Sequence, residues 1–205
     1  MKRTLLAFAL AAPLAAAAQE AAPALQEDPR AARYKEVERG FFVGFETGYL
    51  QLFDTPTDDP VKFPYAGKDG GAAGGLVVGT HVGVDLGNRL AFSIYALGGN
   101  QKASADYGAF SVLSVGGDLR LSLVGTRDRN GMQRLWVYVH GRGGVARTYP
   151  EGLFGTDEIL VSGGPGIEYF TRLRHFSVGL AADYVYAVNA AASGFSVYPT
   201  VRYTF

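Results

Sequence analysis

Hydrophobic and polar residues alternate regularly near the end of the chain. One set contains Phe195, Val197, Pro199, Val201, Tyr203 and Phe205. The intervening set contains Ser196, Tyr198, Thr200, Arg202 and Thr204. Since successive side chains of a strand point to opposite faces, the pattern predicts a strand with one apolar and one polar face. A half-buried strand of a soluble protein alternates in the same way, but this segment has about the length that a tilted transmembrane strand needs.

Seven earlier segments show the same alternation. They are Phe41–Leu50, Leu76–Leu86, Leu90–Ala96, Leu113–Leu123, Leu135–Val145, Ile159–Tyr169 and Phe176–Tyr186. Long Gly-, Pro- and Asp-containing loops alternate with short turns such as Gly87-Asn88. Because only a closed barrel leaves no unpaired strand edge in lipid, the pattern predicts an all-β fold, an eight-stranded antiparallel transmembrane β-barrel.

Pro165 lies in the middle of the sixth predicted strand. Proline has no backbone N–H and therefore removes one hydrogen bond from the ladder. We expect a β-bulge at this position.

The first residues have the features of an export signal. A basic start, Met1-Lys2-Arg3, precedes an apolar run and the small residues Ala16-Ala17-Ala18. This pattern predicts a secretory signal peptide over residues 1–18. Residues 19–39 are rich in Ala, Pro and charge and are predicted to form a flexible periplasmic segment, and residues 40–205 the barrel.

Composition narrows the class of protein further. The chain has no cysteine, so packing and backbone hydrogen bonds must stabilise an exported fold without disulfides. Nineteen basic and nineteen acidic side chains balance, which gives no indication of a nucleic-acid partner. Mean hydropathy is near zero, as expected when lipid-facing and lumen-facing residues alternate.

The polar faces of the predicted strands carry charged residues that would share the barrel lumen. We predict a polar network there of Glu46, His81, Asp85, Asp118, Arg120, His140, Arg142, Glu168, Asp183 and Arg202. An unpaired charge in so narrow a space is costly, so these groups should pair. Since the first and last strands are neighbours in a closed barrel, Glu46 with Arg202 is the first expected pair, and Asp118 or Glu168 with Arg120 or Arg142 are others.

Aromatic and basic residues gather at the predicted strand ends and turns. Aromatic residues there, Trp136 included, are expected to form interfacial girdles. The short turns carry Arg89, Arg127, Arg129, Arg172 and Arg174, which suits an anionic inner leaflet. The two lumen histidines lack the spacing of a metal site, and no cofactor or catalytic pair is indicated.

The alternating strand that ends on Phe205 resembles the C-terminal signature of bacterial outer-membrane β-barrels. The resemblance implies that Val201, Tyr203 and Phe205 are an assembly signal for the barrel-assembly machinery. Over Phe41 to Phe205 the architecture resembles the small barrels of the OmpA transmembrane-domain and OmpX type. It implies a place in the cell outer membrane, in contact with lipid and lipopolysaccharide.

The stretch from Arg33 to Tyr49 is similar to the start of gliding-motility outer-membrane proteins of the CglE type. That resemblance implies a barrel without chemistry of its own in an envelope complex. The sequence therefore predicts a non-enzymatic anchor or scaffold for envelope protein partners. A narrow ion or solute channel is the alternative, and a lipid A-modifying enzyme is less favoured.

Overall fold

A computed structural model describes eight stretches of the chain. The described residues are 37, 39–53, 73–102, 109–129, 131–149, 157–173, 175–189 and 192–205. The predicted signal peptide and nearly all of the predicted periplasmic segment lie outside them. Within the described residues, no helix has the length and apolar character needed to cross a membrane.

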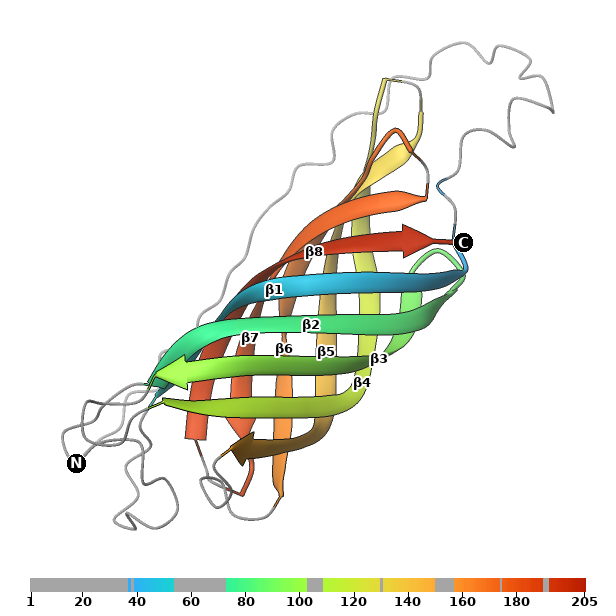
Figure 1. The fold of residues 1–205 in the computed structure, drawn as a ribbon. Coiled ribbons are helices and arrows are strands. Elements are labelled where there is room, and N and C mark those ends of the chain that lie inside the picture. Colours follow the sequence, from blue (N-terminus) through green and yellow to red (C-terminus); the bar gives the residue numbers. More distant parts are fainter. Residues whose placement is uncertain are drawn as a thin grey trace, which may run out of the picture. The chain divides into compact units, whose positions relative to one another are not determined.

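The described residues form eight antiparallel strands that close into one barrel (Figure 1). The strands are β1 (Phe41–Phe53), β2 (Ala73–Leu86), β3 (Leu90–Lys102), β4 (Ala109–Arg127), β5 (Gln133–Tyr149), β6 (Glu158–Phe170), β7 (Phe176–Ala187) and β8 (Ala192–Thr204). Each strand pairs with its neighbour in sequence, and β1 pairs with β8 to close the ring. The predicted fold class is confirmed.

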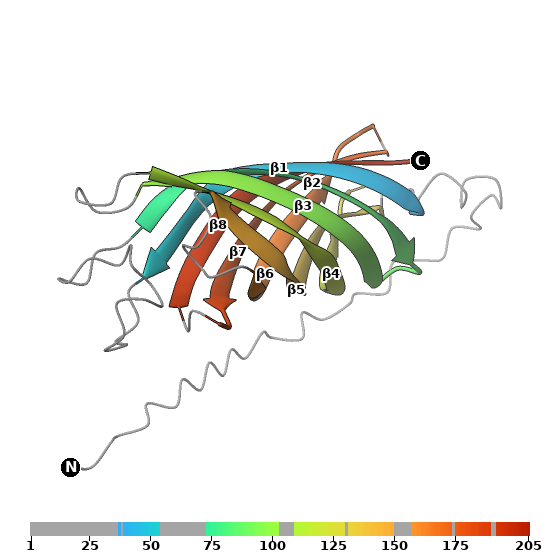
Figure 2. The ribbon, with the colours of Figure 1, turned by 60° about the horizontal axis from the view of Figure 1, so that its bottom comes forward.

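The two ends of the barrel differ in the length of their connections. The β2–β3, β4–β5 and β6–β7 turns lie at one end, together with the start of β1 and the end of β8. The β1–β2, β3–β4, β5–β6 and β7–β8 connections lie at the other end, as the arrangement of strands in Figure 2 shows, and the first three are longer than any of the turns. We call these the short-turn end and the long-loop end.

Side chains alternate between the two sides of the barrel wall, as the sequence predicted. Along β1, exposed Phe41, Val43 and Phe45 alternate with buried Phe42 and Glu46. The same alternation on the other strands leaves the outer wall covered with exposed Leu, Val, Ile, Phe and Tyr side chains. A mainly apolar wall of this kind is suited to lipid contact.

The predicted bulge at Pro165 is wrong. Pro165 pairs with Val139 of β5 in continuous register, and the β6–β7 register is also unchanged on either side of it. The proline instead leaves a gap in the β6–β7 ladder, where no pairs form between Gly163–Tyr184 and Gly166–Ala181. The proline ring replaces an N–H that would point to β7, so the β6–β7 ladder loses hydrogen bonds. No extra residue is inserted in β6, as a bulge would require.

Pro199 produces a matching gap in the ladder between β1 and β8. Pairing stops after Glu46–Thr200 and resumes at Tyr49–Val197, again without a change of register. On its other side Pro199 pairs with Leu180 of β7. The irregularities that do shift register lie in the β4–β5 ladder, between Ser122 and Val124 and between Thr126 and Arg127.

The lumen has an apolar layer toward the long-loop end. Its buried members are Leu50, Leu52, Val77, Phe110, Val112, Ala146, Leu160, Val185, Ala187 and Ala192. Leu97 packs against them. These side chains pack together in one cluster, so this layer fills part of the lumen just inside the long-loop end.

Candidate functional site: the charged barrel lumen

Arg142 of β5 is the centre of the charged lumen. Its Nη1 and Nη2 atoms each donate to a Glu46 carboxylate oxygen at 2.7 Å, and its Nε donates to Asp118 Oδ2 at 3.0 Å. The guanidinium also lies over the rings of Tyr95 and Tyr198. A bidentate pair of this kind is the strong form of a charge-assisted hydrogen bond.

His140 lies between two carboxylates on the same level of the lumen. Its Nε2 atom is 2.8 Å from Asp183 Oδ1, and its Nδ1 atom is 3.4 Å from Asp118 Oδ1. Because ionised carboxylates only accept hydrogen bonds, a ring with protons on both nitrogens satisfies this geometry best. The Tyr198 hydroxyl donates to Asp183 Oδ2 at 2.9 Å, and Ser162 Oγ lies 3.3 Å from the same oxygen.

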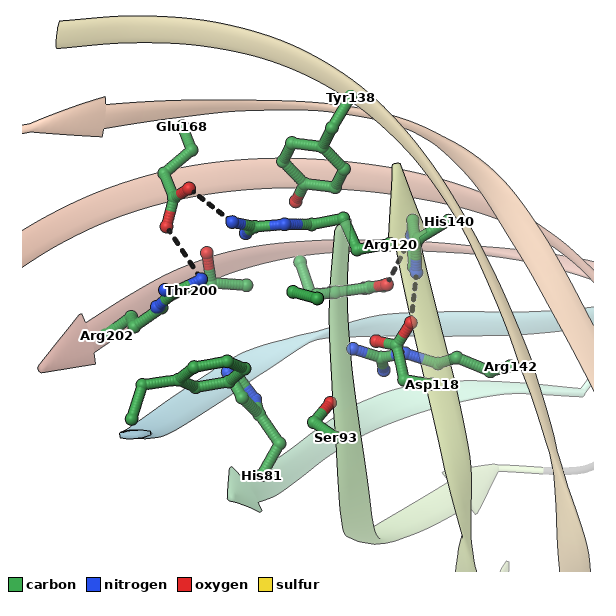
Figure 3. Close-up of a pocket in the computed structure, with 13 residues that line it drawn as sticks. His81, Ser93, Asp118, Arg120, Tyr138, His140, Arg142, Glu168, Thr200 and Arg202 are labelled. Atoms are coloured by element: carbon green, nitrogen blue, oxygen red, sulfur yellow. Dashed lines mark hydrogen bonds and ion pairs between the residues drawn. The ribbon is translucent and has the colours of Figure 1, made fainter. Parts of the chain in front are cut away.

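A second cluster lies nearer the short-turn end, around Glu168 of β6 (Figure 3). Arg120 Nη2 donates to Glu168 Oε2 at 2.8 Å, and Ser177 Oγ donates to Oε1 at 2.7 Å. Arg202 Nη1 lies 3.8 Å from the same carboxylate. The guanidinium of Arg120 is stacked 4.8 Å from the ring centre of Tyr138.

The expected pair of Glu46 with Arg202 is wrong, whereas Asp118 with Arg142 and Glu168 with Arg120 do form. Arg202 Nη2 instead donates to Asp85 Oδ2, and its guanidinium lies 3.8 Å from the ring centre of Phe42. Register explains the difference, because Thr200 is the β8 residue opposite Glu46. Glu46 therefore bonds across the lumen to β5, 96 residues away in sequence.

His81 contributes less to the network than its position suggested. Its Nδ1 atom is 3.6 Å from Glu46 Oε2, and it has no hydrogen-bond partner. The ring packs edge-on against Phe42 at 5.9 Å. His81 therefore lines the lumen without completing an ion pair at hydrogen-bond distance.

Two small cavities lie among the charged side chains of the lumen. One cavity of about 40 Å³ lies among Arg120, Glu168, His140 and their neighbours on the short-turn side. Another of about 40 Å³ lies between the Arg142 level and the apolar layer. Spaces of this size hold one or two water molecules. The Arg142 level thus separates two small cavities.

The short-turn end has a further plug that the sequence did not indicate. Trp136, expected in an interfacial girdle, is buried inside, and the Arg39 guanidinium lies 4.9 Å from its ring centre and 5.6 Å from that of Phe170. Burial lowers the pKa of Arg39, while the charges of Asp85 and Glu168 act in the opposite direction. The girdle prediction is wrong for Trp136 because it shares the inward parity of Tyr138 on β5.

The three residues of the predicted assembly signal lie on the outer wall. Val201, Tyr203 and Phe205 are all exposed, and the rings of Tyr203 and Phe205 are 5.0 Å apart. Phe205 also packs on Phe41 at 5.6 Å, and its N–H donates to the Phe41 carbonyl at 2.9 Å. These contacts join the end of β8 to the start of β1.

Metal ligation was not expected from the lumen histidines. Among the described residues, no group of three or more His, Cys, Asp or Glu side chains is arranged to hold a metal ion. His81 and His140 have no serine hydroxyl among their described partners. Arg120, Arg142 and Arg202 each pair with a carboxylate in the lumen.

The tyrosines of the lumen were not predicted to belong to the network. Tyr198 bonds to Asp183, while Tyr95 and Tyr138 stack on arginines. Alternation along the strands placed all three on inward faces, and that is the signal that could have found them. Their polar ends and apolar rings fit a lumen in which charged groups are packed among apolar side chains.

These features define a class, the closed eight-stranded antiparallel β-barrels with a filled polar lumen. Neisserial surface protein A is a solved structure of similar fold, at 17% identity and a TM-score of 0.56, with 81% of this chain and 97% of that one covered. OprG from Pseudomonas aeruginosa aligns over 83% of this chain and 99% of its own, at 12% identity and a TM-score of 0.49.

The outer membrane enzyme PagL aligns over 78% of this chain and 99% of its own, at 13% identity and a TM-score of 0.42. No protein-family model matches the sequence, and the search of curated proteins gives no match. The structural matches named above include no motility protein, so the gliding-motility resemblance gains no support from them. At these identities the comparisons concern the fold.

Proposed function

We propose that this protein is an outer-membrane barrel with a closed lumen, which acts as a non-enzymatic anchor or scaffold for partners in the cell envelope. The apolar outer wall supports the membrane location, and the short-turn end faces the periplasm in this proposal. Recognition of Val201, Tyr203 and Phe205 by the barrel-assembly machinery stays a prediction.

The observation that carries the proposal is the way Arg142 and Glu46 span the lumen. Both side chains are nearly fully buried, and their two hydrogen bonds at 2.7 Å join opposite walls. The apolar layer fills the lumen between this pair and the long-loop end. The Arg39–Trp136 contact lies between the pair and the short-turn end. A lumen closed at these three levels offers no path for solutes. The outer wall and the connections between strands are then the surfaces that partners can contact.

Planar-bilayer recording of the refolded chain tests the closed lumen. We expect no steady current from the wild type, because an ion would have to cross both the paired charges and the apolar layer. The variant with Arg120→Ala and Arg142→Ala should also be silent, since the apolar layer remains. Arg147→Ala is the control, because Arg147 lies on the outer side of β5 and pairs with exposed Asp157.

Steady single-channel current from the wild type would overturn the proposal and favour the narrow channel. Current from the double variant alone would contradict the role given to the apolar layer, because the two arginines would then be what blocks the lumen of the wild type. Insertion of each variant is checked beforehand by the β-sheet circular dichroism of the same liposome preparation.

A further inference from the structure

A groove lies outside the lumen at the short-turn end, between the β4–β5 turn and the β6–β7 turn. Its volume is about 590 Å³. Its lining includes Arg127, Asp128, Arg134, Leu135, Tyr169 and Arg172. Figure 1 shows the two turns at the same end of the barrel as the C-terminus.

Arg134 holds the two turns together and so fixes the shape of the groove. Its Nε donates to Asp128 Oδ2 at 2.8 Å, and its Nη1 donates to the Thr171 carbonyl at 2.6 Å. Asp128 Oδ1 accepts from the N–H of Met132 at 3.1 Å. The one carboxylate of the lining is therefore engaged by Arg134 and by its own turn.

Arg127 and Arg172 give the groove an excess of positive charge. Both are exposed, and neither has an ion-pair partner among the residues that the structure describes. A guanidinium with free donors is well suited to phosphate oxygens, which it can bind in a bidentate manner. The charge of the groove therefore favours a phosphate-bearing ligand.

The other side of the groove belongs to the apolar outer wall. Leu135 and Tyr169 are cross-strand partners of β5 and β6, and their side chains are 37% and 44% exposed. They continue directly into the outward row that includes Val137 and Ile167. A ligand that contacts both sides must have an anionic head and an apolar tail, and tyrosine is typical of the level where the two meet.

We propose that this groove binds the headgroup of an anionic phospholipid in the periplasmic leaflet, with Arg127 and Arg172 on the phosphate and Leu135 and Tyr169 against the acyl chains. The inference rests on the membrane orientation proposed above, but not on the closed lumen. A conducting barrel would leave it intact, so the two proposals fail separately.

Native mass spectrometry of the detergent-solubilised full chain tests this site. Phosphatidylglycerol and phosphatidylethanolamine with identical acyl chains are titrated, and retained lipid is counted per barrel. We expect preferential retention of phosphatidylglycerol. Arg127→Gln with Arg172→Gln should lower its affinity by about fivefold for each arginine and about thirtyfold for the pair.

The matched control is Arg89→Gln with Lys102→Gln. It removes the same charge from exposed positions, one on the β2–β3 turn and one at the long-loop end. Equal affinity of the wild type for both lipids, or an equal loss in the control, would overturn the proposal. A third arm adds soluble glycerol 3-phosphate, and displacement of the lipid at equal concentration would show a free-anion site instead of a lipid site.

Discussion

Replacing Arg142 with Met should destabilise the barrel by about 3–5 kcal/mol, because it leaves a buried ion pair without its cation. Glu46 and Asp118 would lose three hydrogen bonds, and Glu46 would keep only the distant His81 nitrogen. The expected result is a midpoint of urea unfolding well below that of the wild type in the same lipid, with an unchanged slope.

Arg147→Met on the same strand is the matched control. Arg147 also bonds to a carboxylate at 2.7 Å, but the Arg147 and Asp157 side chains are 63% and 57% exposed. Exposed pairs contribute little, so we expect a change below about 1 kcal/mol. Adding Glu46→Gln to Arg142→Met should restore part of the lost stability, because it removes the uncompensated charge. Equal midpoints for the Arg142 and Arg147 variants would contradict the role given to the central pair.

Gly144→Ala should destabilise the barrel by about 1–3 kcal/mol through overpacking. Gly144 faces Gly116 across the β4–β5 ladder on the lumen side. An added Cβ would lie 2.4 Å from the Val115 carbonyl oxygen and 2.8 Å from the Gly116 Cα atom. Since both are backbone atoms, a side-chain rotation cannot relieve the clash. The same urea titration measures the cost.

The neighbouring glycine is the control for this second prediction. Gly143 faces outward, and an added Cβ would meet no atom within 4 Å. Gly143→Ala should be neutral or stabilise the fold by about 0.4–1 kcal/mol, since alanine has fewer unfolded conformations to lose. A cost for Gly143→Ala as large as that for Gly144→Ala would indicate a general intolerance of β5 to side chains.

The side of the wall on which each residue lies could be predicted from sequence because it depends only on parity along a strand. Glu46, Asp118, Arg120 and Arg142 lie in the lumen for that reason. Trp136 has the same inward parity as Tyr138, so parity alone would have placed it in the lumen. Its residue type and its place near a strand end suggested the membrane–water interface instead.

The partners of Glu46 and Arg202 could not be predicted, because they depend on how the strands are staggered around the closed ring. Glu46 and Arg202 lie on adjacent strands, but the register sets Gly44 opposite Arg202. The carboxylate then reaches across the lumen to Arg142, and Arg202 turns to Asp85. The apolar layer escaped prediction for another reason, since each strand contributes only one or two of its residues.

The two proline gaps have a joint consequence for motion in the wall. Pro165 interrupts the ladder on one side of the β7–β8 hairpin, and Pro199 interrupts it on the other. The pairing of β7 with β8 themselves runs without a break from Phe176–Tyr203 to Ala187–Ala192. Local opening is favoured where backbone hydrogen bonds are fewest, so we expect the β7–β8 hairpin to open as a unit. Two prolines on the lipid-facing side of the wall therefore determine which pair of strands we expect to open first.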